Sequence, residues 1–281
     1  MDILVLDSSS TDATMCIVEE SGCARFHRID RKDFNHGATR ELARRLLNTD
    51  IVILLTQDVV LLPGVVSALV EPLVCRRADI AYARQLPHVG AGLLEAFPRL
   101  YNYPSEPQNR SLEDVTRYGV YTFFCSDSCA AYRNEALERI GGFRAILTNE
   151  DYFAAARILR VGGRIEYVSR AEVRHSHCYS LWEEFVRYFD TGFVRAQHPW
   201  VNSLVGNAEN RGAGFAFEFL RAVGRSEPLK IGYAFFQLCV KWLGFRIGYI
   251  SFRFAGAWCR YFSSQRYYWE SEYVNLETVD D

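Results

Sequence analysis

Two short polar clusters follow apolar runs of the chain and carry residues that can ligate a metal. Thr56-Gln57-Asp58 follows Ile51–Leu55, and a carboxylate at the end of a buried strand can bind Mg²⁺ or Mn²⁺, which prefer oxygen ligands and bridge phosphates. His175-Ser176-His177 follows a second apolar run. Residues two apart on an extended chain point to one face, so both imidazoles can approach one site. A capped turn explains the first cluster equally well. Beside Asp58, one of the histidines becomes a candidate metal ligand.

Two further clusters offer carboxylates for binding or for proton transfer. Asp7 opens the segment Asp7–Asp12, and its carboxylate can accept a hydrogen bond from the imide of uracil or thymine or from a ribose hydroxyl. Ordinary capping chemistry also accounts for Asp and Ser at such a turn. Glu150-Asp151 precedes the helix-like stretch 152–160, where an acid is stabilised by the helix dipole. From the same position a carboxylate can act as general base on a hydroxyl.

Alternating strand-like and helix-like segments must position these clusters. The pattern predicts strands at 2–6, 24–29, 51–55, 79–84, 120–125 and 164–168, with helices over 11–20, 37–48 and 63–75. This rhythm predicts an α/β fold with a mostly parallel sheet covered by helices on both faces. Ligands of such sheets bind at the carboxyl ends of the strands, where the four clusters lie. Residues 85–118 interrupt the rhythm and indicate either a loop with short helical pieces for acceptor selection or a packed insertion.

The last third of the chain differs in composition. We expect a catalytic domain over 1–200, which ends in a helix at 178–197, a linker over 201–227, and a basic aromatic tail of amphipathic helices over 228–281. Between residues 221 and 266 there are eight basic residues and one acid, which suits the interface of an anionic membrane. Helices packed on the catalytic domain are the alternative. The longest uncharged stretch of the tail is ten residues, too short to span a bilayer.

Composition argues against several classes of protein. A formal charge of −2 in 281 residues gives no basic footprint for nucleic-acid binding. The eight cysteines form no C-x-x-C pair, which indicates reduced thiols and not a disulfide framework. Cys125 and Cys129 with His175 and His177 lack the usual spacing of a structural zinc site. No charged leader precedes an apolar run, so no signal peptide is predicted.

Taken together and in order, these clusters resemble a known family. The segments that carry the resemblance are Asp7–Asp12, Phe34-Asn35-His36-Gly37, Thr56-Gln57-Asp58, FCSDSCAAYRNEAL (124–137), Gly141-Gly142-Phe143 with Glu150-Asp151, and HSHCYS with RYFDTG. They resemble the inverting family 2 glycosyltransferases with the GT-A (Rossmann-like) fold, and most of all their bacterial rhamnosyltransferase branch. The resemblance covers roughly residues 2–197, and the basic aromatic tail is similar as well.

The resemblance implies a role for each candidate residue. Asp151 would deprotonate the acceptor hydroxyl, Asp58 would hold an Mg²⁺ or Mn²⁺ that bridges the donor diphosphate, and His175 would complete the metal site. Donor-binding positions would be Asp7, Phe34, Asn35, His36, Gly37, Arg40 and Gln57. Inversion at an anomeric carbon needs one base, and the departing diphosphate needs its charge neutralised by a cation.

The implied partners are a nucleotide-sugar donor, dTDP-L-rhamnose first, and a lipid-linked glycan acceptor of a surface polysaccharide. The implied location is peripheral, at the cytoplasmic face of the plasma membrane. A UDP-sugar donor is the alternative within the class, and a non-catalytic membrane-associated protein on a degenerate transferase fold is the alternative outside it. A nucleotidyltransferase would be expected to carry a basic Gly-rich phosphate loop near its N-terminus, and none is visible.

The sequence departs from the family pattern in three ways. Thr56 replaces the first acid of the metal motif, which predicts a modest metal affinity. Glu41 stands where the family commonly has Asn, and would add negative charge if it faced the diphosphate pocket. The family's first strand and helix have no counterpart before residue 2. We therefore expect a gap beside residues 2–6 that leaves an apolar strand edge unpaired, with poor stability or weak donor binding.

Overall fold

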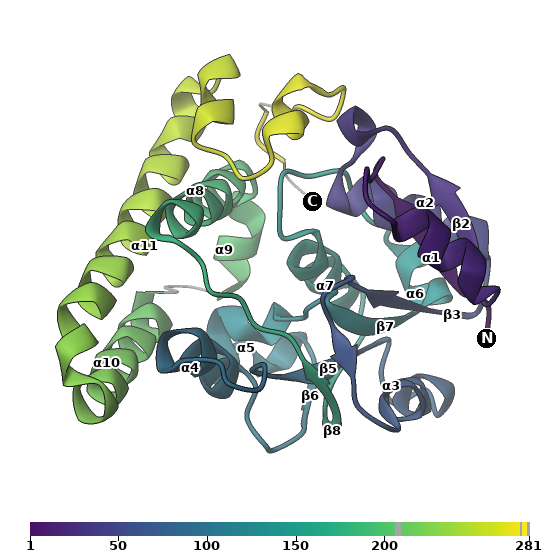
Figure 1. Cartoon of the computed structure of the whole chain (residues 1–281), viewed down its shortest axis with the longest axis horizontal. Coiled ribbons are helices and arrows are strands. Elements are labelled where there is room, and N and C mark those ends of the chain that lie inside the picture. Colours follow the sequence, from purple (N-terminus) through teal and green to yellow (C-terminus); the bar gives the residue numbers. More distant parts are fainter. Residues whose placement is uncertain (206–208, 276, 280–281) are drawn as a thin grey trace.

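The computed structural model describes residues 1–205, 209–275 and 277–279, and it contains two sheets surrounded by helices (Figure 1). Six strands form the larger sheet in the order β3-β7-β5-β8-β4, with β6 paired to β8 beyond the end of β4. The smaller sheet joins β1 and β2 in parallel. The strands are β1 (Leu4–Asp7), β2 (Arg25–Arg28), β3 (Ile51–Leu55), β4 (Val60–Leu61), β5 (Ile80–Leu86), β6 (Gln108–Arg110), β7 (Cys129–Arg133) and β8 (Ile165–Arg174).

The α/β prediction is confirmed, but the larger sheet is mixed instead of mostly parallel. Strands β5 and β8 are parallel, whereas β7 runs antiparallel to both β3 and β5. The sequence pattern missed β7 because its central residues are Ala130 and Ala131, which have low strand propensity and are fully buried. It placed a strand at 120–125 instead, where the structure has a 3₁₀ turn over Gly119–Phe123 whose aromatic side chains fill the core without pairing in a sheet.

Helices cover both faces of the larger sheet, as predicted. Alternate residues of β5 point to opposite faces: Ile80 and Tyr82 belong to one buried apolar cluster, whereas Ala81 and Ala83 belong to the other. Helix α7 contributes to the first cluster and α3 to the second. The helices up to residue 160 are α1 (Thr14–Ser21), α2 (His36–Leu47), α3 (Val65–Val74), α4 (Leu93–Asn102), α5 (Val115–Tyr118), α6 (Asn134–Arg139) and α7 (Glu150–Arg160).

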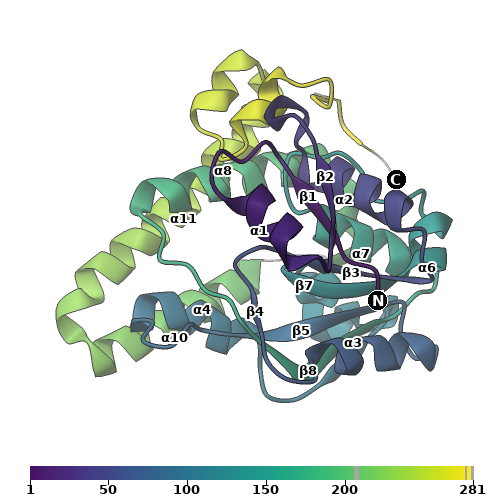
Figure 2. The ribbon, with the colours of Figure 1, turned by 45° about the vertical axis from the view of Figure 1, so that its right-hand side comes forward.

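The small sheet stands apart from the larger one. Strand β1 is paired in register with β2 from Leu4 opposite Arg25 to Asp7 opposite Arg28. Within the described residues, β1 has no strand on its other side, so the edge that the sequence predicted to be unpaired is unpaired in the fold. Figure 2 shows this sheet and α1 beside α2, above the plane of β3 and β7. Asp7 lies at the carboxyl end of β1, where the pattern placed it.

The C-terminal helices pack on the catalytic part of the chain. They are α8 (Leu181–Gln197), α9 (Pro199–Val205), α10 (Glu209–Ser226) and α11 (Ile231–Ser251). Residues 209–226, which were predicted to be part of a linker, form α10 and lie against α11 and α4. Residues 206–208 of that predicted linker lie outside the described residues. The polar, glycine-containing sequence of this stretch predicted a linker, but burial of Phe219 and Val223 against α11 stabilises a helix.

Glycines bring α8 and α11 into close contact. A Cβ atom added at Gly192 of α8 would overlap the backbone of Phe245, and one added at Gly248 of α11 would overlap the backbone of Phe189. Small residues at such positions let two helix backbones approach closely. The inner face of α11 therefore packs on the catalytic part of the chain, as the alternative interpretation of the tail predicted. No helix in the described part of the chain is long and apolar enough to cross a membrane.

Candidate active site

Asp58, His175 and His177 converge on one point. Asp58 follows β3, and His175 continues β8 by donating its backbone N–H to Leu86 O at 3.0 Å. Asp58 Oδ2 lies 3.3 Å from the Nε2 atom of each histidine, and the two Nε2 atoms are 2.9 Å apart. The prediction that both imidazoles face one site is confirmed, and both histidines, not only His175, reach Asp58.

This cluster fits a divalent cation. One ligand atom from each of the three residues lies within 4.8 Å of the others. Asp58 Oδ1 is buried and has no hydrogen-bond partner among the described residues, so a carboxylate lone pair is left for a metal. Two imidazole nitrogens with one carboxylate suit a first-row ion such as Mn²⁺ better than Mg²⁺, which prefers oxygen ligands throughout.

A second layer of residues orients His175. Its Nδ1 lies 2.9 Å from Gln85 Oε1, and Gln85 Nε2 donates to Ser126 Oγ at 2.8 Å. Because the amide oxygen of Gln85 accepts from Nδ1–H, the Nε2 lone pair of His175 faces Asp58. Burial and the nearby Arg99 guanidinium lower the pKa of His175 to about 4, so the imidazole is neutral at pH 7, as a metal ligand must be.

Helix α8 begins shortly after the metal triad, by which we mean Asp58, His175 and His177, and a capping box fixes its first residue. Ser180 Oγ accepts from Glu183 N at 3.3 Å, while Glu183 Oε2 accepts from Ser180 N at 2.8 Å. This reciprocal capping box fixes the N-terminus of α8 three residues after His177. The segment 178–179 is thereby held between the end of β8 and the start of α8.

Asp151 lies in the first turn of α7 with its carboxyl group deep among protein atoms. Oδ1 accepts from Tyr152 N at 2.7 Å, and Oδ2 accepts from Asp127 N at 3.3 Å. Burial raises the pKa of Asp151, although the Arg40 guanidinium and these backbone hydrogen bonds act in the opposite direction. A carboxylate with a raised pKa is a stronger base than one in water, so this group is suited to take a proton from a hydroxyl.

Asp127 is a further acid at this site, and it was not among the site residues predicted from the sequence. Its side chain is fully buried, Oδ1 accepts from Tyr132 OH at 2.5 Å, and Oδ2 lies 3.4 Å from Arg40 Nε. Burial and the negative charge of Asp151 raise the pKa of Asp127 to about 7, while Arg40 acts to lower it. The available signal was an acid between two serines directly before a strand, and it was hidden because β7 was not predicted.

Arg40 and the Phe34–Gly37 turn lie beside these acids. Arg40 forms ion pairs with Asp127 and Glu150, so carboxylates of the protein hold its guanidinium in this structure. Asn35 caps α2 by accepting from Ala38 N at 3.0 Å, and its Nδ2 donates to Ile146 O at 2.8 Å. Gly37 is required because a Cβ there would overlap the carbonyl of Arg144. The turn is therefore fixed against the loop that precedes Asp151.

The aromatic residues of that turn contact each other. The rings of Phe34 and His36 meet edge to face with centroids 4.8 Å apart. Burial, with the positive charges of Arg40 and Arg187, lowers the pKa of His36 to about 4. His36 is therefore a neutral hydrogen-bonding group at pH 7.

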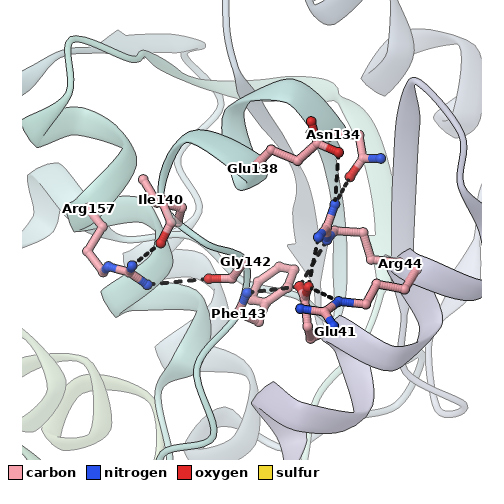
Figure 3. A network of polar contacts seen from close by, with 9 residues as sticks. Glu41, Arg44, Asn134, Glu138, Ile140, Gly142, Phe143 and Arg157 are labelled. Atoms are coloured by element: carbon pink, nitrogen blue, oxygen red, sulfur yellow. Dashed lines mark hydrogen bonds and ion pairs between the residues drawn. The ribbon is translucent and has the colours of Figure 1, made fainter.

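Glu41 does not add charge to this site. It pairs with Arg44 and Arg45 on its own helix, and its Oε2 accepts from Phe143 N at 3.1 Å (Figure 3). Arg44 in turn contacts Asn134 and Glu138. Glu41 thus joins α2 to the Gly141-Gly142-Phe143 turn, and its carboxylate is neutralised by two arginines.

Two predicted donor residues stand apart from these clusters. Asp7 is buried at the end of β1, where its Oδ2 accepts from Ser10 N at 3.0 Å as the capped turn predicts. Gln57 is exposed next to Asp58 in the turn after β3. Within the described residues, neither side chain makes a hydrogen bond to the other candidate residues. Their roles toward a donor remain predictions.

Comparison with known proteins identifies the family. Residues 1–141, half of the chain, match the model of "Glycosyl transferase family 2". The chain belongs to this family. It is 36% identical to O-antigen chain rhamnosyltransferase RfbN of Salmonella typhimurium, over 96% of this chain and 87% of the relative. It is 34% identical to O-antigen chain rhamnosyltransferase WbaN of Salmonella anatum, over 96% of this chain and 86% of that protein.

A solved structure supports the fold of this glycosyltransferase. The mannosyltransferase PcManGT from Pyrobaculum calidifontis, solved with GDP-Man and Mn²⁺, is similar with a TM-score of 0.54 over 89% of this chain and 76% of that chain, at 15% identity. The GT-A prediction is confirmed, and the protein is an enzyme. The family match includes Asp7, Arg40 and Asp58, whereas Asp151 and the two histidines are reached by the RfbN and WbaN alignments.

Proposed function

We propose that this glycosyltransferase transfers L-rhamnose from dTDP-L-rhamnose, with inversion, to a lipid-linked O-antigen acceptor. The observation that carries the proposal is the convergence of Asp58, His175 and His177 at the carboxyl ends of β3 and β8, in a chain whose curated relatives are O-antigen rhamnosyltransferases. Asp7, Phe34–Gly37, Arg40 and Gln57 are the proposed donor contacts.

Asp151 is the proposed base of the reaction. Its carboxylate accepts the proton of the acceptor hydroxyl while the hydroxyl oxygen bonds to the anomeric carbon. On the opposite side of that carbon the bond to the diphosphate oxygen breaks, and dTDP leaves with the bonding electron pair. One displacement inverts the configuration and needs no covalent enzyme intermediate. A divalent cation held by Asp58, His175 and His177 would neutralise charge on the donor diphosphate.

The outer face of α11 is the proposed contact with the membrane. Ile231, Phe235, Trp242 and Tyr249 recur at helical spacing and are exposed, with Phe235 at 59% and Trp242 at 62%. Exposed Arg246 lies over the Trp242 ring on this face, and exposed Arg253 follows just after the end of α11. An aromatic and basic helix face suits the headgroup region of an anionic bilayer. We therefore propose a peripheral position at the cytoplasmic face of the plasma membrane.

Donor binding and transfer test the function separately. Thermal stability of the protein is measured with dTDP, UDP and GDP, each with and without Mn²⁺, because a ligand at 100 Kd stabilises the folded state by about 2.7 kcal/mol. We expect a Mn²⁺-dependent increase that is largest for dTDP. A larger increase with UDP would indicate a UDP-sugar donor.

The variant Asp151→Asn then tests catalysis. It should keep the dTDP-dependent stabilisation and lose transfer of rhamnose by at least a hundredfold, since a base contributes roughly 10²–10⁴-fold. Asp30→Asn, an exposed acid before α2, is the matched control and should transfer normally. If Asp151→Asn transfers rhamnose at the wild-type rate, Asp151 is not the base. If the wild type shows no transfer at all, the catalytic proposal fails.

A further inference from the structure

A cavity of about 210 Å³ lies next to the metal triad. His177 belongs to both the triad and the cavity wall, so the two sites adjoin. The other walls come from α4, from residues 178–179, from α8 and from α11. The cavity thus combines the segment 85–118, for which acceptor selection was one interpretation, with the C-terminal helices. Its charged residues are Arg99, Arg187, Lys241, Glu95 and Glu184.

Both carboxylates of the cavity, Glu184 and Glu95, already have polar partners within the protein. Glu184 Oε1 lies 3.0 Å from Lys241 Nζ and accepts from Gln237 Nε2 at 3.0 Å. Glu95 accepts a hydrogen bond from Ser176 Oγ. Lys241, which is half-buried, thus neutralises Glu184, and the hydrogen bond from Ser176 holds Glu95 at the cavity wall.

Two guanidinium groups remain uncompensated. Within the described residues, neither Arg99 nor Arg187 has a carboxylate at ion-pair distance. Arg99 lines the same cavity wall as His177 and Tyr179. Arg187 is held 4.4 Å above the centre of the Tyr179 ring. The cavity therefore offers two guanidinium groups beside the reaction centre, of which Arg99 is half-buried and Arg187 is exposed and stacked on Tyr179.

We propose that Arg99 and Arg187 bind the diphosphate of the lipid-linked acceptor. The proposal rests on the proposed function for the reaction itself. In that reaction the cation at Asp58 serves the diphosphate of the donor, so a second pair of positive charges fits a second anionic substrate. Guanidinium groups bind phosphate oxygens through paired N–H donors, which makes arginine well suited to this ligand.

The position of the cavity also orients such an acceptor. His177 lines the end of the cavity that adjoins the metal triad. At this end the acceptor sugar must present its hydroxyl to the donor. Tyr233 lines the cavity from the first turn of α11 and is 44% exposed, next to exposed Phe235 and Phe236. The lipid chain would leave the cavity on this apolar side. A diphosphate joined directly to a prenyl chain satisfies both ends of the cavity.

Calorimetric titration with citronellyl diphosphate, a short soluble prenyl diphosphate, tests the site. The full chain is titrated with Mn²⁺ and saturating dTDP, so that the donor site is filled, and again without dTDP. The variants are Arg99→Gln and Arg187→Gln, with Arg99→Lys to retain charge if the glutamine variant is unstable. Arg225→Gln, at the exposed end of α10, is the matched control.

We expect each glutamine variant to lower the affinity for citronellyl diphosphate at least tenfold and to leave the affinity for dTDP within twofold of the wild type. The Arg225→Gln control should change the affinity for neither ligand. Inorganic pyrophosphate should bind more weakly than citronellyl diphosphate, because it lacks the apolar chain. Equal affinity for the two would overturn the lipid assignment.

Other outcomes overturn the site itself. These are absence of citronellyl diphosphate binding to the wild type, unchanged affinity in both arginine variants, or an equal loss of dTDP affinity, which would assign the cations to the donor. Failure of the proposed function looks different. In that case the wild type does not bind dTDP with Mn²⁺, whereas citronellyl diphosphate still binds and still depends on Arg99 and Arg187.

Discussion

Replacing Asp127 by asparagine tests the electrostatics of the buried acid pair. Asparagine has the shape of aspartate and can still accept from Tyr132 OH, but it cannot ionise. In the folded wild type the pKa of Asp127 is raised from 3.8 to about 7, because the side chain is buried beside Asp151. In the unfolded chain the carboxyl group titrates near its ordinary value. Folding therefore becomes less favourable as pH rises from about 4 to about 7, and the penalty is constant above that range.

The size of the effect follows from the same shift. Each pKa unit corresponds to about 1.4 kcal/mol, so between pH 5 and pH 8 the wild type loses about 2–3 kcal/mol that Asp127→Asn does not lose. Titrating groups remote from this pair, such as Asp190, are common to both proteins and cancel in the difference. Asp151 does not cancel, because loss of the Asp127 charge also makes Asp151 easier to ionise, which acts in the same direction.

Urea unfolding followed by tryptophan fluorescence measures this difference. The free energy of unfolding of Asp127→Asn, minus that of the wild type, should be about 2–3 kcal/mol more positive at pH 8 than at pH 5. Asp30→Asn, at an exposed site, should show no comparable change. If the difference for Asp127→Asn is the same at both pH values, Asp127 has an ordinary pKa in the folded protein. The lowering of that pKa by Arg40 then balances the increase caused by burial.

Three further variants test the metal site and the helix packing. His177→Ala should lower the affinity for Mn²⁺, measured by calorimetry, and unchanged affinity would restrict the site to Asp58 and His175. Gln85→Leu removes the acceptor for His175 Nδ1–H and should weaken Mn²⁺ binding by roughly 10–100-fold. Gly248→Ala should destabilise the protein by about 1–3 kcal/mol, because the new Cβ overlaps the Phe189 backbone. Gly232→Ala, where the added Cβ meets open space, is its control and should not destabilise the protein.

The local patterns that predicted the fold were those with strong periodicity. Ile51–Leu55 is a strand at the predicted bounds, because a continuous β-branched and leucine run covered on both faces has few alternatives. The turn after it and the H-x-H pair could be placed at strand ends from sequence alone. That both histidines reach Asp58 depends on β4, which begins two residues after Asp58 and pairs with the end of β8 so that Val60 lies opposite Arg174. No local pattern encodes this pairing.

The missed features share a physical cause. Strand β7 is rich in alanine, so neither hydrophobicity nor propensity marked it, and Asp127 directly before it was not recognised. The glycines within 201–227 favoured a linker where the structure has α10, and no pattern in the sequence marked Gly244 and Gly248 of α11 as contact points between helices. The sheet is mixed instead of mostly parallel because the missed strand β7 runs antiparallel to both of its neighbours, and connection patterns do not report an antiparallel insertion.

The close contact of α8 and α11 has a mechanical consequence. Helix α8 begins at a capping box three residues after His177, and the glycines that join it to α11 leave no space in which the two helices can slide. If the outer face of α11 lies in the headgroup region, the metal triad stands at a set height above the bilayer. The enzyme would then select its acceptor sugar by distance from the lipid: a sugar at the height of the metal triad would be glycosylated, and sugars nearer to the bilayer or farther from it would not.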